Sequence, residues 1–428
     1  MKKLAVRILM TYLLLVLLFT GLLTGAFLIP RQAIEPQVRQ SVAQLVEDGD
    51  RYDHVSIGMV TPWMLGDFSD CLMLGIAYCA DSSKPLSSAM SAVFPMKDGS
   101  PIEGARLTLE AGGDSGDSGE GVHPVIYSRY WHGNQVVLRP LLALTTVRGI
   151  YGLNIVLLAL LWMLMTAALW RRTGPGNALI IMLCLAAVMI PSVPLCMNYV
   201  PTFYIAMTAS LLILTWRRCT ATPGDAVLLF FVIGAFTTYL DLLTTPMIAM
   251  AVPLLVYMLY RRPTHSWRAV IVLALAWLLG YALLWATKWL LAVLVIGPSA
   301  VQDAMGAVTQ RTVGHDEGDY MLWCLKWTLA ALAGTTVVTL LASLLLGGTR
   351  QALRRHGWLL LVALSSFVWA LVLLEHTWHH LHFTWRTFIV AAIGVLLYLY
   401  HQKSHQTVPL MSKKCLDHET DCSHHTVL

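Results

Sequence analysis

The residues best suited to chemistry in this chain are charged side chains that lie beside long apolar runs. Asp67 and Asp70 share one polar segment, and Asp241 closes an apolar run further on. A carboxylate in such a place can act as a general base towards a hydroxyl group. Ionisable groups near membrane depth are costly, so they indicate either a functional site or a paired structural bridge.

Four cations are candidates for holding a phosphate group, because a fixed positive charge stabilises negative charge as it develops. They are Arg129, Arg139, Lys288 and Arg386. Single residues of the proposed site have simpler explanations. The cation Lys288 could reach out to the membrane interface, and the carboxylate Asp241 could cap a helix break before Pro246. Their common location at the outer ends of predicted helices favours a shared site.

Aromatic residues and histidines accompany these charges. Tyr130, Trp131 and His132 offer flat faces on which a sugar ring or lipid chain could lie, and Gly133 lets the backbone approach closely. The alternative is an interfacial belt of aromatic residues and arginines. Two further candidates for substrate packing, His376 and His380, are four residues apart and would share a helix face. No third ligand stands at a fixed spacing from them, so hydrogen bonding at the interface is favoured over metal binding.

Composition identifies the class of protein that must position these groups. The 428 residues are 57% hydrophobic and 12% charged, with a mean hydropathy of +0.65. So little charge excludes a soluble globule of this size, and runs of about 20 apolar residues predict membrane helices. We therefore expect an all-α integral membrane protein with ten spans, at about 8–29, 149–170, 178–196, 201–216, 225–241, 246–260, 267–288, 325–347, 357–375 and 385–401.

The distribution of charge predicts the orientation. Residues 30–148 hold nine Lys or Arg against fourteen Asp or Glu, so this segment is −5 and the rest of the chain is +10. Arginine pairs occupy the short loops elsewhere, which places those loops in the cytoplasm and residues 30–148 outside. We expect a multi-pass protein of the cell membrane with both termini cytoplasmic.

Five regions follow from these spans. We expect a cytoplasmic N-terminus and a retained first helix (1–29), an exoplasmic domain (30–148), a nine-helix membrane region (149–401) that contains a second outer loop (289–319), and a disordered cytoplasmic tail (402–428).

Several local features complete these expectations. Residues 34–47 predict a short surface helix, and 64–80 an amphipathic helix on the membrane interface. Residues 112–121 predict a mobile loop, and 290–296 a re-entrant piece. Cys71 and Cys79 are expected to be free thiols, with a disulfide as the alternative.

Several short motifs resemble those of a known superfamily. They are Asp67-Phe-Ser-Asp70, Ser128-Arg-Tyr-Trp-His-Gly133, Leu138-Arg-Pro-Leu-Leu142, Tyr239-Leu-Asp-Leu-Leu-Thr-Thr-Pro246 and His376-Thr-Trp-His-His380 with Phe383-Thr-Trp-Arg386. Together with a short first helix and a long outer loop, they are similar to the GT-C superfamily of polytopic glycosyltransferases, in particular to a group of bacterial ten-helix membrane proteins.

The resemblance implies a GT-C-like fold and a reaction. Its members use sugars linked to polyprenyl phosphate, and their catalytic base is an aspartate of the first outer loop, which matches Asp70 best and Asp67 second. The Asp-Glu or Asp-x-Asp pair of many members is absent here, so a divalent cation stays an open question.

The expected function is transfer of a sugar from a polyprenyl-phosphate donor to a cell-surface glycan or a lipid-linked acceptor. The partners would be this donor, the acceptor and membrane lipids. No Gly-rich nucleotide-binding motif occurs on the cytoplasmic loops, and we expect no nucleic acid partner. A transporter or lipid flippase is the first alternative, although no internal repeat is visible. A non-enzymatic membrane assembly protein is the second.

Overall fold

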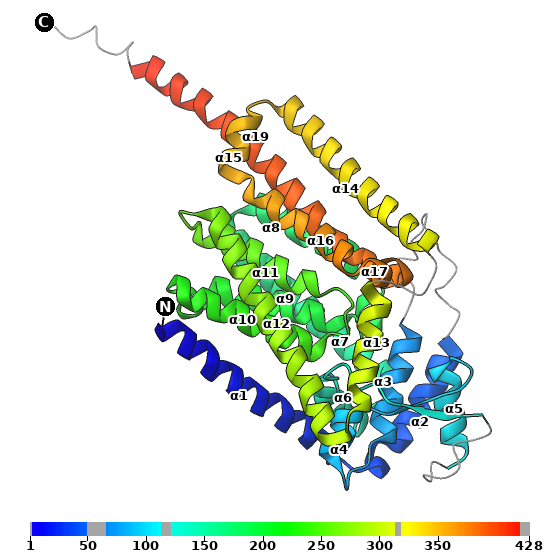
Figure 1. Ribbon diagram of the computed structural model, residues 1–428. Helices are drawn as coiled ribbons and strands as arrows, with labels where there is room; N and C mark the ends of the chain where they lie inside the picture. Colours follow the sequence, from blue (N-terminus) through cyan, green and yellow to red (C-terminus); the bar gives the residue numbers. More distant parts are fainter. Residues whose placement is uncertain (1, 49–65, 113–120, 313–317, 420–428) are drawn as a thin grey trace, which may run out of the picture.

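The structure is a computed structural model that describes residues 2–48, 66–112, 121–312 and 318–419. About 82% of the chain is helical, and the named strands of the described residues form one short two-stranded sheet. The expectation of an all-α membrane protein is confirmed at this level. Figure 1 shows long helices beside one another, with a group of shorter elements at one end, away from both termini.

Among the described residues, seven helical segments are long and apolar enough to cross a membrane. They are α1 (Lys2–Phe27), α7 (Val147–Thr173), α8 (Pro175–Met189) with the 3-10 turn η1 (Val193–Leu195), α10 (Pro223–Leu240), α12 (Ser266–Ile296), α14 (Gly318–Leu346) and the apolar part of α19 (Ile389–Glu419).

The remaining apolar helices are shorter or bent. α15 (Thr349–His356) and α16 (Trp358–Val372) meet at 71° and would make an eighth span if they are one broken helix. α9 (Val200–Thr215) and α11 (Pro246–Arg261) are apolar but shorter. Every one of the ten segments predicted to span therefore coincides with an apolar helix, whereas the number of crossings stays a prediction.

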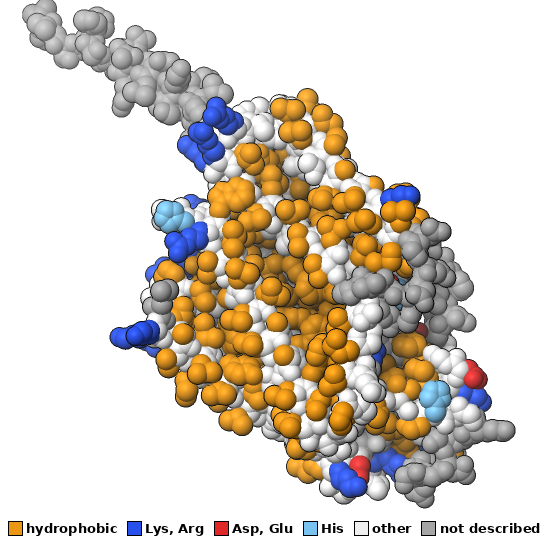
Figure 2. Space-filling model, viewed as in Figure 1, with side chains coloured by type: hydrophobic (Ala, Val, Ile, Leu, Met, Phe, Trp, Pro, Cys, Tyr) orange, Lys and Arg blue, Asp and Glu red, His pale blue; other side chains and the backbone are white. Residues whose placement is uncertain are grey.

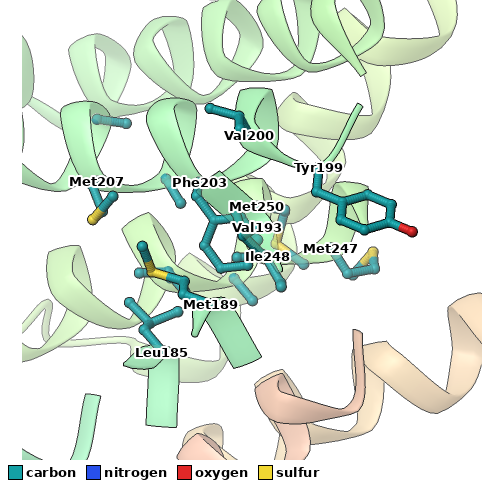
Figure 3. Close-up of a cluster of buried hydrophobic side chains, with 14 of the residues drawn as sticks. Leu185, Met189, Val193, Tyr199, Val200, Phe203, Met207, Met247, Ile248 and Met250 are labelled. Carbon is teal, nitrogen blue, oxygen red and sulfur yellow. The ribbon is translucent and has the colours of Figure 1, made fainter. Parts of the chain in front are cut away.

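α11 lies inside the helix bundle. All of its residues from Pro246 to Leu259 are buried, and it contacts α9, α10, α12, α16 and α19. A helix that is apolar on every face requires such surroundings. Figure 3 shows Ile248 and Met250 of α11 close to Phe203 of α9 and Met189 of α8, all within one buried cluster.

Two glycines let α10 and α12 approach closely. A Cβ atom at Gly234 would lie 1.9 Å from the carbonyl oxygen of Trp277, and one at Gly280 would lie 2.0 Å from that of Phe231. No side chain fits at either distance, so each helix accepts the backbone of the other only because glycine stands there. This contact fixes α12, which also touches α4 (Pro85–Ser91) and α13 (Ser299–Thr312).

The described residues between 30 and 148 build a small domain at one end of the bundle. Its elements are α2 (Arg31–Asp48), α3 (Asp67–Cys79), α4 (Pro85–Ser91), β1 (Phe94–Met96), α5 (Pro101–Glu110), β2 (His123–Val125) and α6 (Gln135–Leu142). β1 and β2 pair antiparallel, with Phe94 opposite Val125. α2 confirms the helix predicted for 34–47 and buries its apolar face, Ile34, Val38, Val42 and Leu45.

α3 corrects a prediction. Its residues from Asp70 to Tyr78 are all buried, in contact with α2, α5 and β1. The expected amphipathic helix on the membrane interface is therefore wrong, because the domain encloses α3 on every side. Cys71 and Cys79 are free, as expected. Eight residues apart on one helix, their Cα atoms are about 12 Å from each other, beyond the reach of a disulfide.

Two further predictions on helix ends are wrong. α12 continues without a break to Ile296, so residues 290–296 form its last turns and not a re-entrant piece. Much of the expected second outer loop is helical too, as α13 (Ser299–Thr312). α19 runs to Glu419 and so includes residues 402–419 of the expected tail, while 420–428 lie outside the described residues. The loop predicted at 112–121 lies mostly outside the described residues, because 113–120 are not described.

Candidate functional site

A cavity of about 520 Å³ lies between the outer domain and the turn that follows α16. Its walls come from the start of α3, residues 127–130, the turn before α9, and the short helices α17 (Leu374–His379) and α18 (Leu381–Thr384). In Figure 1 these elements lie at the end of the bundle opposite the chain termini. The polar lining residues are Asp67, Ser69, Tyr127, Tyr130, Asn198, Tyr199, His376, His379, His380 and His382.

Asp67 is the carboxylate of this cavity. It is the first residue of α3 and is half-buried in the cavity wall. Gly66, which precedes Asp67, lets the turn before α9 pack closely against the start of α3. A Cβ atom at Gly66 would lie only 2.2 Å from Sγ of Cys196 in that turn. A carboxylate in the first turn of a helix is also stabilised by the helix dipole.

Asp70 is enclosed and does not line the cavity. It accepts hydrogen bonds from the hydroxyl of Tyr151 (2.6 Å), the backbone N–H of Met197 (3.0 Å) and Sγ of Cys196 (3.6 Å). Burial raises the pKa of its carboxyl group to about 7, against the smaller opposing effect of these bonds. Asp70 thus ties α3 to α7 and to the turn before α9.

Asp241 likewise serves the local backbone. It follows the last residue of α10, is buried, and accepts hydrogen bonds from the hydroxyl of Thr202 (3.2 Å) and the backbone N–H of Thr244 (3.1 Å). The hydroxyl of Thr244 donates to the same oxygen. Its neighbour Leu242 lines the cavity, but Asp241 does not. This geometry matches the alternative of a cap at the break before Pro246.

Arg139 and Lys288 hold helix ends together and lie outside the cavity. Buried Arg139 donates to the carbonyl oxygens of Ala26 (2.9 Å), Ala77 and Ile29, which joins the end of α1 to α3 and α6. Lys288 is also buried, and its Nζ donates to the carbonyl of Met90 (2.8 Å) at the end of α4. Their expected contact with a donor phosphate therefore has no counterpart in this cavity.

Arg129 and Arg386 stand behind the aromatic walls of the cavity. The guanidinium of Arg129 lies 4.2 Å from the ring centre of Tyr127 and 6.0 Å from that of Tyr130. The guanidinium of Arg386 lies 4.5 Å from the ring centre of Tyr199 and donates to Ser192 Oγ (2.6 Å). All three tyrosines line the cavity, whereas the two arginines do not. Each arginine therefore contributes positive potential from behind a tyrosine ring.

Of the aromatic stretch, Tyr130 faces the cavity, whereas Trp131 and His132 are anchors. Trp131 is fully buried and donates from Nε1 to the carbonyl of Leu284 on α12 (2.7 Å). His132 donates from Nε2 to the carbonyl of Tyr127 (2.9 Å), and burial lowers its pKa to about 3, so it is neutral.

Gly133 permits a close approach, as its sequence position suggested, but to protein rather than ligand. Its N–H donates to the carbonyl of Tyr239 (2.9 Å), and a Cβ atom would lie 2.5 Å from that ring.

Four histidines line the same cavity as Asp67. His376 and His380 lie with ring centres 4.8 Å apart, and His380 stacks on Phe383 at 5.2 Å. Nε2 of His376 donates to the carbonyl of Leu243 (2.9 Å). His379 lines the cavity and approaches Glu375 through Nδ1 at 3.7 Å.

Sequence reasoning missed several lining residues, although most belong to the stretches it singled out. His379 and His382 share the His-rich turn with the two predicted histidines, whereas Tyr127 was expected from the sequence as a flat face for a sugar ring or lipid. Asn198 and Tyr199 carried no signal, because they come from a turn that approaches α3 only in the folded chain. Within the described part of the chain, no three His, Cys, Asp or Glu side chains are arranged to hold a metal ion.

The fold and site define a polytopic helical membrane protein with a polar cavity at one end of its bundle. Comparison with known proteins finds no family model, no curated protein and no solved structure that matches the chain. Its function has to be argued from the site.

Proposed function

We propose that this protein is a membrane glycosyltransferase of the GT-C type, which moves a sugar from a polyprenyl-phosphate donor to a surface glycan or a lipid-linked acceptor. The observation that carries the proposal is the composition of the cavity: one carboxylate, Asp67, faces tyrosines and four histidines. Such a donor brings its own leaving group, so the protein need supply only a positioned base and a positively polarised cradle.

Asp67 is the base in this proposal. A general base must first be within reach of the proton it removes, and its pKa matters only after that. Asp67 lines the cavity, whereas Asp70 is enclosed by Tyr151, Met197 and Cys196. Asp241 is enclosed by its own cap. Access therefore favours Asp67 over the aspartate that the motif resemblance ranks first.

The transfer step balances without a further reactant. The acceptor hydroxyl oxygen attacks the anomeric carbon, Asp67 takes the hydroxyl proton, and the bond from that carbon to the phosphate oxygen breaks with inversion. The polyprenyl phosphate leaves with the electron pair of that bond. His379, His380 and His382 donate hydrogen bonds to the leaving phosphate, while Arg129, next to Tyr127 and Tyr130, adds positive potential. The faces of these tyrosines carry the sugar ring.

The proposal includes an orientation. The cavity lies on the outer side of the cell membrane, the bundle crosses it ten times, and both termini are cytoplasmic. Apolar helices at all ten predicted positions support this arrangement. So do the arginine pairs in the short loops, since positive loops favour the cytoplasm.

The test is transfer by purified protein in liposomes, offered a panel of polyprenyl-phosphate sugars with membrane glycan and lipid-linked acceptors. We expect one donor class to be consumed, with inversion at the anomeric carbon. Solute uptake or lipid scrambling without transfer from any donor would replace the proposal with a transporter or flippase. Inactivity in all three assays would favour an assembly protein.

A further inference from the structure

A second polar cavity, of about 430 Å³, lies at the opposite end of the bundle. α8, α11, α12, α15, α16 and α19 contribute its walls. The residues that line it are Asn177, Met258, Leu259, Arg262, Pro263, Ser266, Arg355, His356, Trp358, His401 and Ser404. It is distant in sequence and fold from the site at Asp67, and the proposed transfer reaction does not use it.

The chemistry of this cavity suits an anion. Arg262 and Arg355 both line it and are exposed, so their guanidinium groups reach its mouth. Two imidazoles, His356 and His401, stack with ring centres 5.1 Å apart and add further donors. Arginine is suited to phosphate because its planar donors can bind two oxygens at once.

Helix ends strengthen the same field. α12 begins at Ser266 and α16 at Trp358, and Asn177 stands in the first turn of α8. All three residues line the cavity, so three helices start at its wall. The first N–H groups of a helix have no partner inside that helix and favour negative charge. α11 and α15 end at the same wall and present carbonyl oxygens there, so the helix starts exceed the helix ends by one.

Carboxylates are scarce around the cavity. Asp225, in the first turn of α10, pairs with Arg7 at 2.7 Å. Figure 2 shows Lys and Arg gathered along this rim, above a broad hydrophobic belt. No described acidic side chain lines the cavity. The described lining therefore offers its arginines no carboxylate as a partner.

The surroundings indicate a lipid rather than a soluble anion. Met258, Leu259 and Trp358 make part of the wall apolar. Beside it, Trp267 of α12 is 43% and Leu353 of α15 is 46% exposed. Tryptophan and arginine together are typical of the membrane interface. We propose that this cavity binds the phosphate headgroup of an anionic phospholipid.

The test is native mass spectrometry of delipidated protein, titrated with phosphatidylglycerol or with phosphatidylcholine. We expect wild type to retain phosphatidylglycerol preferentially, and Arg262→Ala/Arg355→Ala to weaken that binding by at least about tenfold, because two charged donors are lost. The matched control is Arg217→Ala/Arg218→Ala, which removes two exposed arginines at the same end that do not line the cavity. Equal loss in the control, or equal binding of phosphatidylcholine, would overturn the proposal.

A third variant separates binding from folding. Ser266→Asp puts a carboxylate on the cavity wall in the first turn of α12, where the helix dipole stabilises it. We expect an unchanged or slightly higher melting temperature together with loss of phosphatidylglycerol binding. Retained binding would contradict the proposal. Displacement of the lipid by millimolar inorganic phosphate would show that the anion is a soluble phosphate, and the lipid assignment would fail.

Discussion

Two aspartates of α3 have different surroundings: Asp67 lines a cavity, whereas Asp70 is buried in the protein core. Asp67 and Asp70 are three apart, so a helix places both on one side, and sequence reasoning had no local basis for choosing between them. The difference comes from Tyr151 and Met197, which cover Asp70 from other elements. Such long-range partners leave no trace in residue spacing.

The raised pKa of Asp70 predicts a pH-dependent stability. Burial raises its pKa from 3.8 to about 7, so the folded state binds the proton more tightly than the unfolded state. The stabilisation is fully present below about pH 4 and is lost as the pH rises through about 7, by roughly 4 kcal/mol in total. Asp70→Asn cannot ionise, so the variant should gain stability relative to wild type as the pH rises from about 4 to about 7.

Melting temperatures in detergent, measured for both proteins across this range, check the prediction. A difference between variant and wild type that stays constant with pH would mean that Asp70 does not titrate as described. Asp67→Asn provides the comparison, because its half-buried side chain lies in the cavity wall.

Arg139 predicts a loss of stability rather than a direct loss of substrate contact. Arg139→Ala would leave the buried carbonyl groups of Ala26, Ile29 and Ala77 without this donor. An unsatisfied buried acceptor costs about 1–3 kcal/mol, so we expect a large fall in melting temperature.

The control is Arg148→Ala, which removes an exposed arginine that pairs with Glu47 and Asp48 and should cost about 1 kcal/mol or less. Equal melting temperatures for the two variants would sink the structural role of Arg139. The sequence identified Arg139 as unusual but could not name its partners, because backbone carbonyls carry no sequence signature.

At the scale of elements, hydropathy located every apolar helix, because a run of apolar side chains is a local property. Hydropathy failed to predict features that depend on contacts with neighbouring elements. α3 was expected on the membrane interface, but α2, α5 and β1 cover it. The segment 290–296 was expected to bend, but nothing interrupts α12 before Gly297.

The close contact of α10 and α12 predicts that their glycines cannot be enlarged. Gly280→Leu would drive a side chain into the carbonyl of Phe231 on α10. Overpacking of this kind typically costs about 1–3 kcal/mol, and here the obstacle is backbone, so the cost should be at the upper end.

Gly152→Leu on α7 is the matched control, because nothing lies within 4 Å of a Cβ atom there. Size-exclusion profiles after heating in detergent would compare the two. Similar profiles for both variants would show that α10 and α12 are not held as tightly as described.

For the whole molecule, charge distribution gave an orientation and the structure gave a matching division of the chain. The described part of the acidic segment 30–148 lies at one end of the bundle, and the arginine pairs lie at or just beyond the helix ends of the other. Reporter fusions at residues 120 and 428 are expected to be exoplasmic and cytoplasmic, respectively. A cytoplasmic reporter at residue 120 would invert the orientation and remove the basis for an outer site.

The sequence predicted which stretches of the chain line the proposed cavity better than it predicted the individual residues. The acidic, aromatic and His-rich stretches that the sequence singled out all contribute residues to the lining of this one cavity. Of the four predicted cations, none lines the cavity, because a buried cation most readily satisfies itself on helix ends and aromatic faces.

The most direct test of the account is the rate of sugar transfer by Asp67→Asn compared with Asp70→Asn, in liposomes with the donor that wild type uses. Loss of a general base commonly costs about a hundredfold to ten-thousandfold. We predict that loss for Asp67→Asn at an unchanged melting temperature, and a rate within a few-fold of wild type for Asp70→Asn. Full activity of Asp67→Asn, with activity lost in Asp70→Asn or Asp241→Asn, would contradict the assignment of the cavity as the place of catalysis.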